Sequence, residues 1–194
     1  ERVRWQPPVR GVTVPPDAAL DDLAERLNSA DNIAILGGYG CHGYHDQVVA
    51  LADKLKAPVV HALRGKQSLE YDNPFDVGMT GLIGFSSGYE ALKKCDLLVM
   101  LGTNFPYRDF FPDHGNIIQV DIRGHHLGRR SQLAMGLIGD IGPTLDALLP
   151  RLETHDNTRF LEINQDNYRE ARKDLDELAS ARDDGKPVHP QHLT

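Results

Sequence analysis

Ile33-Ala34-Ile35-Leu36, followed at once by Gly37-Gly38-Tyr39-Gly40, is the stretch that decides the fold of this chain. Four consecutive apolar residues that end in a glycine-rich turn are typical of a strand buried on both faces. A helix from about residue 42 to residue 55 is expected to follow the turn. These segments form a first unit of strand, loop and helix.

The same alternation recurs along the chain. Short apolar runs predict strands at 58–61, 97–101, 117–121 and 135–138, and helical spacing predicts helices at 17–29, 85–94 and 141–152. Asp17 is expected to cap the first helix, and 62–84 is expected to be a long loop. Parallel strands need crossover connections, which place helices on both faces of a sheet. We therefore expect a doubly wound α/β fold: a mostly parallel, six-stranded Rossmann-like sheet with helices on both faces.

The length of 194 residues fits one domain with extensions. Four prolines within 7–16 predict an N-terminal linker over 1–16, because proline fixes φ and removes a backbone donor. The Rossmann-like domain is expected over 17–153, a charged surface helix over 154–182 and a second linker over 183–194. Since the chain starts without methionine, we expect it to be a segment of a longer protein.

Charge and composition exclude several classes of protein. A nucleic-acid partner is not expected, because the net charge is −7 and phosphate-backbone binding needs clustered Lys and Arg. Cys41 and Cys95 lie far apart and predict neither a disulfide framework nor a zinc site. No apolar run approaches the roughly 20 residues that span a bilayer, and residues 1–5 do not resemble a signal sequence. A cytoplasmic location is expected.

Ligands of open parallel sheets bind at the carboxyl ends of the strands, where loops diverge and helix N-termini offer unpaired N–H groups. In the first such loop, Gly38 would let the backbone approach a phosphate, but glycines also suit a tight turn. After the strand at 58–61, Arg64 would either clamp a phosphate or form a surface ion pair. Both alternatives stay open for both residues.

Two further loops combine small, polar and aromatic residues. The loop that begins at residue 79 can lie against a planar ring and offer backbone N–H groups, or it can be an ordinary helix entry. Its candidate contacts are Thr80, Gly81, Leu82 and Ile83. The loop after the strand at 97–101 places hydroxyl, amide and aromatic groups together, which suits a hydrogen-bonding ligand. Its candidates are Thr103, Asn104, Phe105, Pro106 and Tyr107.

Two aspartates follow predicted strands. Asp121 stands where dinucleotide-binding folds place the acid that accepts ribose hydroxyls, and Asp140 is placed similarly, with a helix N-cap as the alternative for each. Cys41-His42 is a weak candidate for an activated thiol, and the pair His125-His126 lacks metal-site spacing and is interpreted as an exposed loop pair. Without an acid–base pair, we expect no catalytic residue and no metal ligand, but a domain that holds a cofactor.

At these loops the chain resembles a known family. The resemblance is carried by His61-Ala62-Leu63-Arg64-Gly65-Lys66, Glu70-Tyr71-Asp72-Asn73-Pro74, Val77-Gly78-Met79-Thr80-Gly81-Leu82-Ile83-Gly84, Leu101-Gly102-Thr103 and Phe105-Pro106-Tyr107-Arg108. Together they closely resemble the FAD-binding middle domain of the thiamine-diphosphate-dependent pyruvate oxidases of the pyruvate:quinone oxidoreductase type. The likeness runs from about residue 12 to 191, nearly the whole chain.

The resemblance implies a parent chain of three α/β domains. The first and third would form the site for thiamine diphosphate and Mg²⁺, and the middle one, present here, would hold FAD. The parent would convert pyruvate, quinone and water to acetate, CO₂ and quinol, passing electrons through FAD. It would be a homotetramer, peripheral on the inner face of the cell membrane, and this domain would be inactive without its flanking domains.

The resemblance also implies roles for single residues. Thr80 to Ile83 would line the flavin and its ribityl chain, and Thr103 to Tyr107 the region between flavin and phosphate. Asp121 would hold the adenosine ribose, and Asp140 would lie near the adenine. Gly38 would lie near the pyrophosphate and Arg64 near the flavin. Two alternatives remain: a structural middle domain without flavin from a thiamine-diphosphate decarboxylase, and an independent nucleotide-binding domain.

Overall fold

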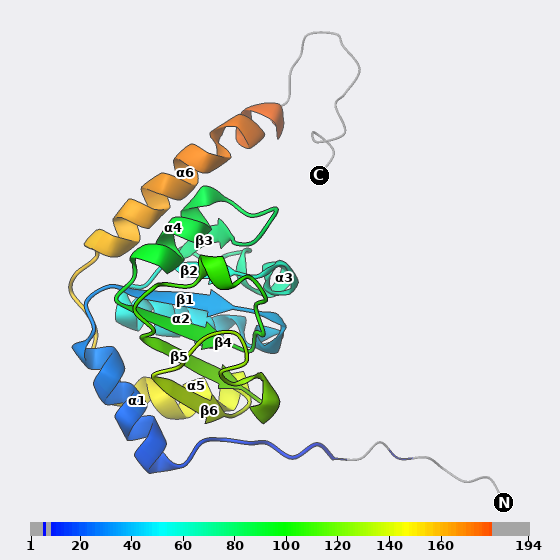
Figure 1. Cartoon of the computed structure of the whole chain (residues 1–194), viewed down its shortest axis with the longest axis vertical. Coiled ribbons are helices and arrows are strands. Elements are labelled where there is room, and N and C mark those ends of the chain that lie inside the picture. The colour runs from blue at the N-terminus through cyan, green and yellow to red at the C-terminus, as the bar shows by residue number, and fades with distance from the viewer. Residues whose placement is uncertain (1–5, 7–8, 180–194) are drawn as a thin grey trace, which may run out of the picture.

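A computed structural model describes residue 6 and residues 9–179 of the chain. These residues form a six-stranded sheet in which every neighbouring pair is parallel, in the order β3-β2-β1-β4-β5-β6 (Figure 1). The strands are β1 (Ile33–Gly37), β2 (Val59–His61), β3 (Asp76–Met79), β4 (Leu97–Leu101), β5 (Ile117–Asp121) and β6 (Met135–Ile138). The expected Rossmann-like sheet is confirmed, and it is parallel throughout.

Helices cover both faces of the sheet. They are α1 (Asp17–Ser29), α2 (His45–Leu55), α3 (Lys66–Leu69), α4 (Ser86–Lys94), α5 (Ile141–Leu148) and α6 (Arg159–Ala179). Side chains alternate along β1. Ile33 and Ile35 therefore join the core under α1, α2 and α5, whereas Ala34 and Leu36 join the core under α4 and α6. The two cores make β1 and β4 buried along their whole length.

The edge strand β3 lies within the segment 62–84, which the sequence predicted to be a loop, so that prediction is wrong. Its sequence Asp-Val-Gly-Met has no continuous apolar run, and the residue register with β2 shifts between Val59 and His61. Gly78 is required here, because its φ is +93° and a Cβ would lie 2.6 Å from the Tyr168 ring. Tertiary packing against α6, rather than local pattern, makes this segment a strand.

Two helix starts also differ from expectation. Asp17 does not cap α1, because Pro16 occupies the N-cap position and no side chain makes the cap hydrogen bond. Helix α2 begins at His45 rather than near residue 42, because Tyr39–Cys41 form a turn of 3-10 helix and Gly43 adopts a φ of +82°. The turn keeps the residues before α2 at the carboxyl edge of the sheet.

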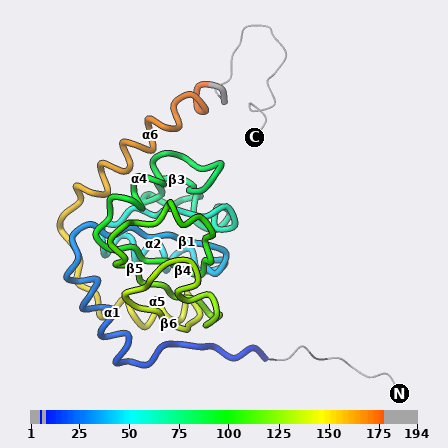
Figure 2. Tube along the Cα trace, in the orientation of Figure 1, coloured from blue at the N-terminus to red at the C-terminus, as the bar shows by residue number. Residues whose placement is uncertain are grey.

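The helix α6 runs diagonally across α4 and the β3 edge, and the extended segment before α1 passes β6 at the other end of the sheet (Figures 1 and 2). Tyr168 contacts Phe85 edge to face, with ring centroids 5.3 Å apart. No helix among the described residues is long and apolar enough to cross a membrane. The predicted linker at 183–194 lies outside the described residues.

Candidate functional site

A cleft of about 1130 Å³ opens at the carboxyl ends of the strands. The sheet order reverses between β1 and β4, and open α/β sheets bind ligands at this position. The cleft is lined by every residue that the sequence predicts to contact a cofactor, namely Gly38, Arg64, Thr80, Gly81, Leu82, Ile83, Thr103, Asn104, Phe105, Pro106, Tyr107, Asp121 and Asp140. The fold thus brings all of them to one site, and the role of each stays a prediction.

The loops after β1 and β4 cross in direct backbone contact at the centre of the cleft. The Gly40 amide donates to the Gly102 carbonyl at 3.0 Å, and the Gly38 amide donates to the Leu101 carbonyl at 2.9 Å. A Cβ on Gly40 would lie 2.6 Å from the Gly102 Cα, and Gly102 itself has a φ of +57°. The glycines at this crossing are therefore required by loop packing, whether or not a phosphate lies above them.

Arg64 forms a stack rather than an ion pair. Its guanidinium carbon lies 4.3 Å from the centroid of the Tyr39 ring, and His42 stacks on that ring with a 4° angle between planes. Among the described residues, no carboxylate pairs with Arg64. A stacked cation at the mouth of a cleft keeps its N–H donors available to an anion.

The loop after β3 contains a buried hydroxyl without a hydrogen-bond partner and two aliphatic side chains exposed to solvent. The Thr80 hydroxyl is buried without a hydrogen-bond partner, although Thr80 lines the cleft. Gly81 has a φ of +119°, which disfavours any other residue. Leu82 and Ile83 are 76% and 73% exposed. These two neighbouring side chains place apolar surface at the rim of the cleft, where a ligand can cover it.

The loop after β4 is held by packing and hydrogen bonds. Phe105 is buried against Tyr107, Phe110 and Phe111, with ring centroids 5.2 to 5.9 Å apart. The Thr103 carbonyl accepts a hydrogen bond from Gln119 at 3.0 Å. Phe105 therefore serves the core as well as the cleft wall, and the loop is packed against the core.

The carboxylate of Asp121 is buried at the end of β5 and has two partners. The Arg123 amide donates to Oδ1 at 2.8 Å, and His126 Nδ1 lies 3.1 Å from Oδ2. The interpretation of His125-His126 as an exposed loop pair is wrong for His126, whose side chain is largely buried against Asp121. Each carboxylate oxygen has two lone pairs, so Asp121 can still accept a ligand hydroxyl.

Asp140 occupies the N-cap position of α5 but makes no side-chain cap hydrogen bond. Its Oδ2 accepts from the Thr13 amide at 2.8 Å, and its Oδ1 accepts from Arg10 at 2.6 Å. Arg10 also lines the cleft. Sequence reasoning missed Arg10, because it lies 130 residues from its partner in a proline-rich segment that shows no local pattern.

A buried pair of titratable side chains, His61 and Asp76, lies beneath the β2–β3 end of the cleft. His61 Nε2 is 3.4 Å from Asp76 Oδ1, and both side chains are buried. Burial and the nearby Lys66 lower the pKa of His61 to about 4. Burial raises the pKa of Asp76 to about 7, against hydrogen bonds from the Gly78 amide and Tyr168. Near neutral pH the imidazole is therefore uncharged.

The weak candidate thiol is excluded by its surroundings. Cys41 is fully buried, and burial raises its pKa to about 12, so the thiol stays protonated at neutral pH. Within residues 9–179, no group of three or more His, Cys, Asp or Glu side chains could hold a metal ion.

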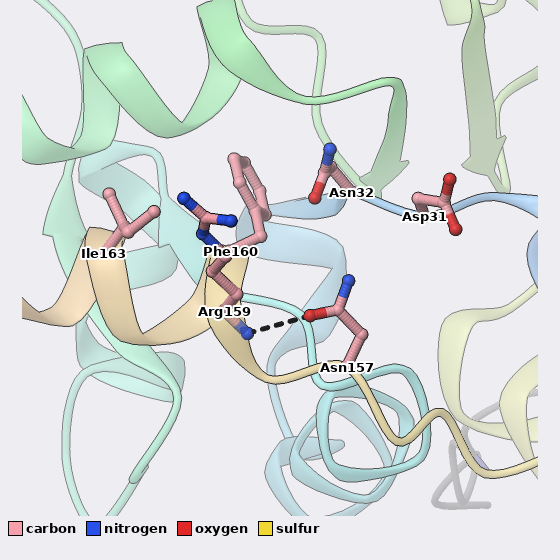
Figure 3. A pocket seen from close by; sticks show the side chains of 6 residues that line it. All are labelled: Asp31, Asn32, Asn157, Arg159, Phe160 and Ile163. Atoms are coloured by element: carbon pink, nitrogen blue, oxygen red, sulfur yellow. Dashed lines mark hydrogen bonds between the residues drawn. The ribbon is translucent and has the colours of Figure 1, made fainter.

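A smaller pocket of about 420 Å³ lies at the opposite edge of the sheet, between the segment before β1 and the start of α6 (Figure 3). Asp31, Asn32, Asn157, Arg159, Phe160 and Ile163 line it. The Asn157 side chain accepts from the Arg159 amide at 3.1 Å, as expected at a helix start. This pocket lies at the amino ends of the strands, away from every predicted site residue.

Residues 20–148 match the family model described as thiamine pyrophosphate enzyme, central domain. An uncharacterized 42.6 kDa protein in the isoamylase 3′ region of Pseudomonas amyloderamosa is 52% identical over 176 residues, which cover 91% of this chain and 44% of that protein. A putative thiamine pyrophosphate-containing protein of Bacillus subtilis, YdaP, is 34% identical over 189 residues, covering 95% and 32%.

Two further similarities widen the range of reactions. The probable 2-ketoarginine decarboxylase AruI of Pseudomonas aeruginosa is 34% identical over 149 residues, covering 75% of this chain and 26% of that protein. The X-ray structure of a putative thiamin diphosphate-dependent enzyme from Mycobacterium smegmatis superimposes with a TM-score of 0.61 at 26% identity, covering 78% and 31%. The chain spans less than half the length of each of these proteins.

Proposed function

The chain belongs to the thiamine pyrophosphate enzymes, whose central domain it forms, and on that premise we propose that its cleft binds FAD. The observation that carries the proposal is the meeting of loops from all six strands in one cleft of about 1130 Å³. This volume lies just above the range of about 300 to 1,000 Å³ that is usual for small-molecule sites, which suits a ligand as large as a dinucleotide. The cleft also changes character along its length.

The residues present fit the two halves of this cofactor. The end formed by β5 and β6 carries the buried acids Asp121 and Asp140, which suit ribose hydroxyls and the amino group of adenine. The end formed by β2 and β3 carries exposed Leu82 and Ile83 and the backbone of Gly81, which suit a flat apolar ring. Arg64 is available to the pyrophosphate or to the ring.

The protein groups in this proposal bind, orient and exclude water. The Phe105 cluster fixes the loop after β4, so its backbone donors need little reorganisation when the cofactor binds. Leu82 and Ile83 would cover the ring and leave solvent. FAD would supply two-electron chemistry that this chain's own side chains cannot supply.

A narrower form of the proposal names the parent reaction. The loops resemble those of pyruvate:quinone oxidoreductases, so the parent would oxidise pyruvate, with thiamine diphosphate and Mg²⁺ held by the flanking domains. A homotetramer at the inner face of the cell membrane and a quinone acceptor belong to this narrower form. Assay of the full-length parent with pyruvate and a soluble quinone analogue decides between this reaction and those of other family members.

A second candidate is a middle domain that holds no flavin and serves as structure within a decarboxylase. Two observations favour it. A relative named as a probable 2-ketoarginine decarboxylase matches 75% of this chain, and both acids in the cleft already have partners within the protein. The two candidates differ in a single measurable property, the binding of FAD.

The test is a calorimetric titration of this chain with FAD, with NAD as the control ligand, beside two matched variants. Thr80→Val removes an unpartnered buried hydroxyl next to the cleft, and Thr144→Val removes one in α5 that does not line it. Both variants should be about 1 kcal/mol more stable than this chain without substitutions, because an unsatisfied buried group is lost. Thr80 lines the cleft and Thr144 does not, so only Thr80→Val should weaken FAD binding.

Saturable binding of FAD without binding of NAD supports the proposal. If neither ligand binds to this chain and the full-length parent also purifies without flavin absorbance, the flavin-free candidate holds instead. Equal FAD affinity of the two threonine variants would remove Thr80 from the site while leaving the proposal for the cleft intact.

A further inference from the structure

Residues 9–16, here called the N-terminal strap, are fixed to the β6 end of the sheet from Thr13 onward. The Asp140 amide donates to the Thr13 carbonyl at 2.9 Å, and the Thr13 amide donates to the Asp140 carboxylate at 2.8 Å. Pro15 packs so closely that a Cβ on Gly139 would lie 2.9 Å from it. The strap therefore has a defined place beside the mouth of the cleft.

Arg10 lies beyond this anchor and lines the cleft. Its side chain is 74% exposed, whereas the Asp140 side chain that it contacts at 2.6 Å is 8% exposed. A guanidinium has five N–H donors in a planar fork that matches phosphate geometry. Within the described residues Asp140 is the one ion-pair partner of Arg10, so donors remain for a ligand.

A second guanidinium, that of Arg123, lines the same end of the cleft as Arg10. At this end of the cleft Asp121 is paired with His126 and Asp140 with Arg10, and Arg123 also lines the wall. Among the described residues no carboxylate forms an ion pair with Arg123, so its guanidinium is also available to a ligand. A phosphate reaching this end meets two guanidinium groups, while each buried carboxylate keeps a partner of its own.

We infer that Arg10 is a ligand-binding residue contributed by the strap, and that it contacts the phosphate-bearing adenosine half of the bound nucleotide. The inference rests on the proposed function and adds a form of regulation to it. A ligand held by Arg10 orders residues 9–12, and by reciprocity any displacement of the strap lowers ligand affinity. The strap thereby couples the cleft to the chain that precedes the domain.

The experiment compares Arg10→Ala, Arg10→Lys and Arg26→Ala in this chain. Arg26 is a surface arginine paired within α1, so Arg26→Ala is the matched control for loss of a guanidinium. The probes are FAD, ADP and FMN, because ADP keeps the adenosine half and FMN lacks it. We expect Arg10→Ala to weaken FAD and ADP about tenfold, with FMN unchanged. Arg10→Lys should recover only part of this loss, since an ammonium lacks the fork.

Hydrogen exchange of residues 11–14 gives a second readout. ADP should slow exchange there in the parent sequence and in Arg26→Ala, but not in Arg10→Ala. Equal ADP affinity of Arg10→Ala and Arg26→Ala overturns the inference and leaves the proposed function standing. If the parent sequence and the full-length protein bind neither FAD nor ADP, the proposed function fails and the inference fails with it. Thermal melting of each variant checks that it is folded.

Discussion

The two ends of the cleft differ in how far the protein satisfies its own groups. At the β5–β6 end, the buried acids Asp121 and Asp140 each accept two hydrogen bonds from within the protein. At the β2–β3 end, the buried Thr80 hydroxyl accepts none, and Leu82 and Ile83 are exposed to solvent. One end is complete by itself, whereas the other exposes groups that a neighbour would satisfy.

The two ends of the cleft would therefore contribute differently to binding: one would orient the ligand and the other would provide apolar contact area. Carboxylates held by hydrogen bonds are preorganised and fix the position of a polar ligand group at little entropic cost. Exposed aliphatic side chains contribute area that gains free energy only when something covers it. A ligand with a polar half and a flat apolar half uses both ends, and the crossing of the two central loops sets the distance between them.

The largest effect on stability is expected at Gly102, where the two ends of the cleft meet. Gly102→Ala places a Cβ 2.4 Å from the Gly40 Cα in a residue with a φ of +57°. Left-handed strain and the clash between the loops should together lower the free energy of unfolding by more than about 3 kcal/mol. Thermal denaturation should show a melting temperature lower by roughly 10 °C.

Gly128→Ala is the matched control, because Gly128 has a similar φ of +67° but no atom within 3.4 Å of a Cβ. It should cost only the conformational strain, about 1 kcal/mol. If the two variants lose the same stability, the crossing of the loops is not a tight contact. The two ends of the cleft would then be free to move relative to each other.

The second prediction concerns the buried pair beneath the β2–β3 end. Asp76→Asn should raise stability at pH 8 by on the order of 2 kcal/mol relative to the parent sequence, and have little effect at pH 4. Burial raises the pKa of Asp76 to about 7, so the folded state holds a proton that the unfolded state releases near 4. The parent sequence therefore loses stability as pH rises from about 4 to 7, and the variant lacks this loss.

His61 gives the opposite trend and serves as the internal control. Its pKa is lowered to about 4, so it costs stability as pH falls below its ordinary value of 6.5. Lys66, Glu70, Tyr168 and Arg172 also surround the pair. Chemical denaturation from pH 4 to 8 should show the difference between Asp76→Asn and the parent sequence growing up to pH 7. A difference that does not change with pH would mean that Asp76 is ionised in the folded state.

Much of the fold follows from the sequence, because β1 and β4 are buried on both faces and therefore appear as unbroken apolar runs. The edge strand β3 does not, since Asp76-Val77-Gly78-Met79 acquires its strand conformation from packing against Tyr168, about 90 residues away. Local sequence patterns predict strands in which every residue is buried, because these strands are apolar throughout. Such patterns cannot predict an edge that a distant helix covers.

The candidate site was predictable to the extent that it lies on strand ends. Residues as far apart as Gly38 and Asp140 were expected to converge, because all parallel strands present their carboxyl ends at one edge. The partners of the two acids were not predictable. Arg10 reaches Asp140 from a segment 130 residues away, and His126 reaches Asp121 through a turn. Neither arrangement has a recognisable pattern in the sequence.

The smallest effect on stability is expected at the exposed rim of the cleft. A substitution there tests directly whether the apolar end of the cleft contacts the ligand. Leu82→Ser should change the free energy of unfolding by less than about 0.5 kcal/mol, because the side chain is 76% exposed. It should weaken FAD binding about tenfold if the flat ring covers this side chain. Tyr71→Ser is the control, since Tyr71 is 77% exposed and does not line the cleft. Equal FAD affinity of the two variants would assign Leu82 to a contact with a neighbouring domain, and the apolar end of the cleft would no longer belong to the ligand.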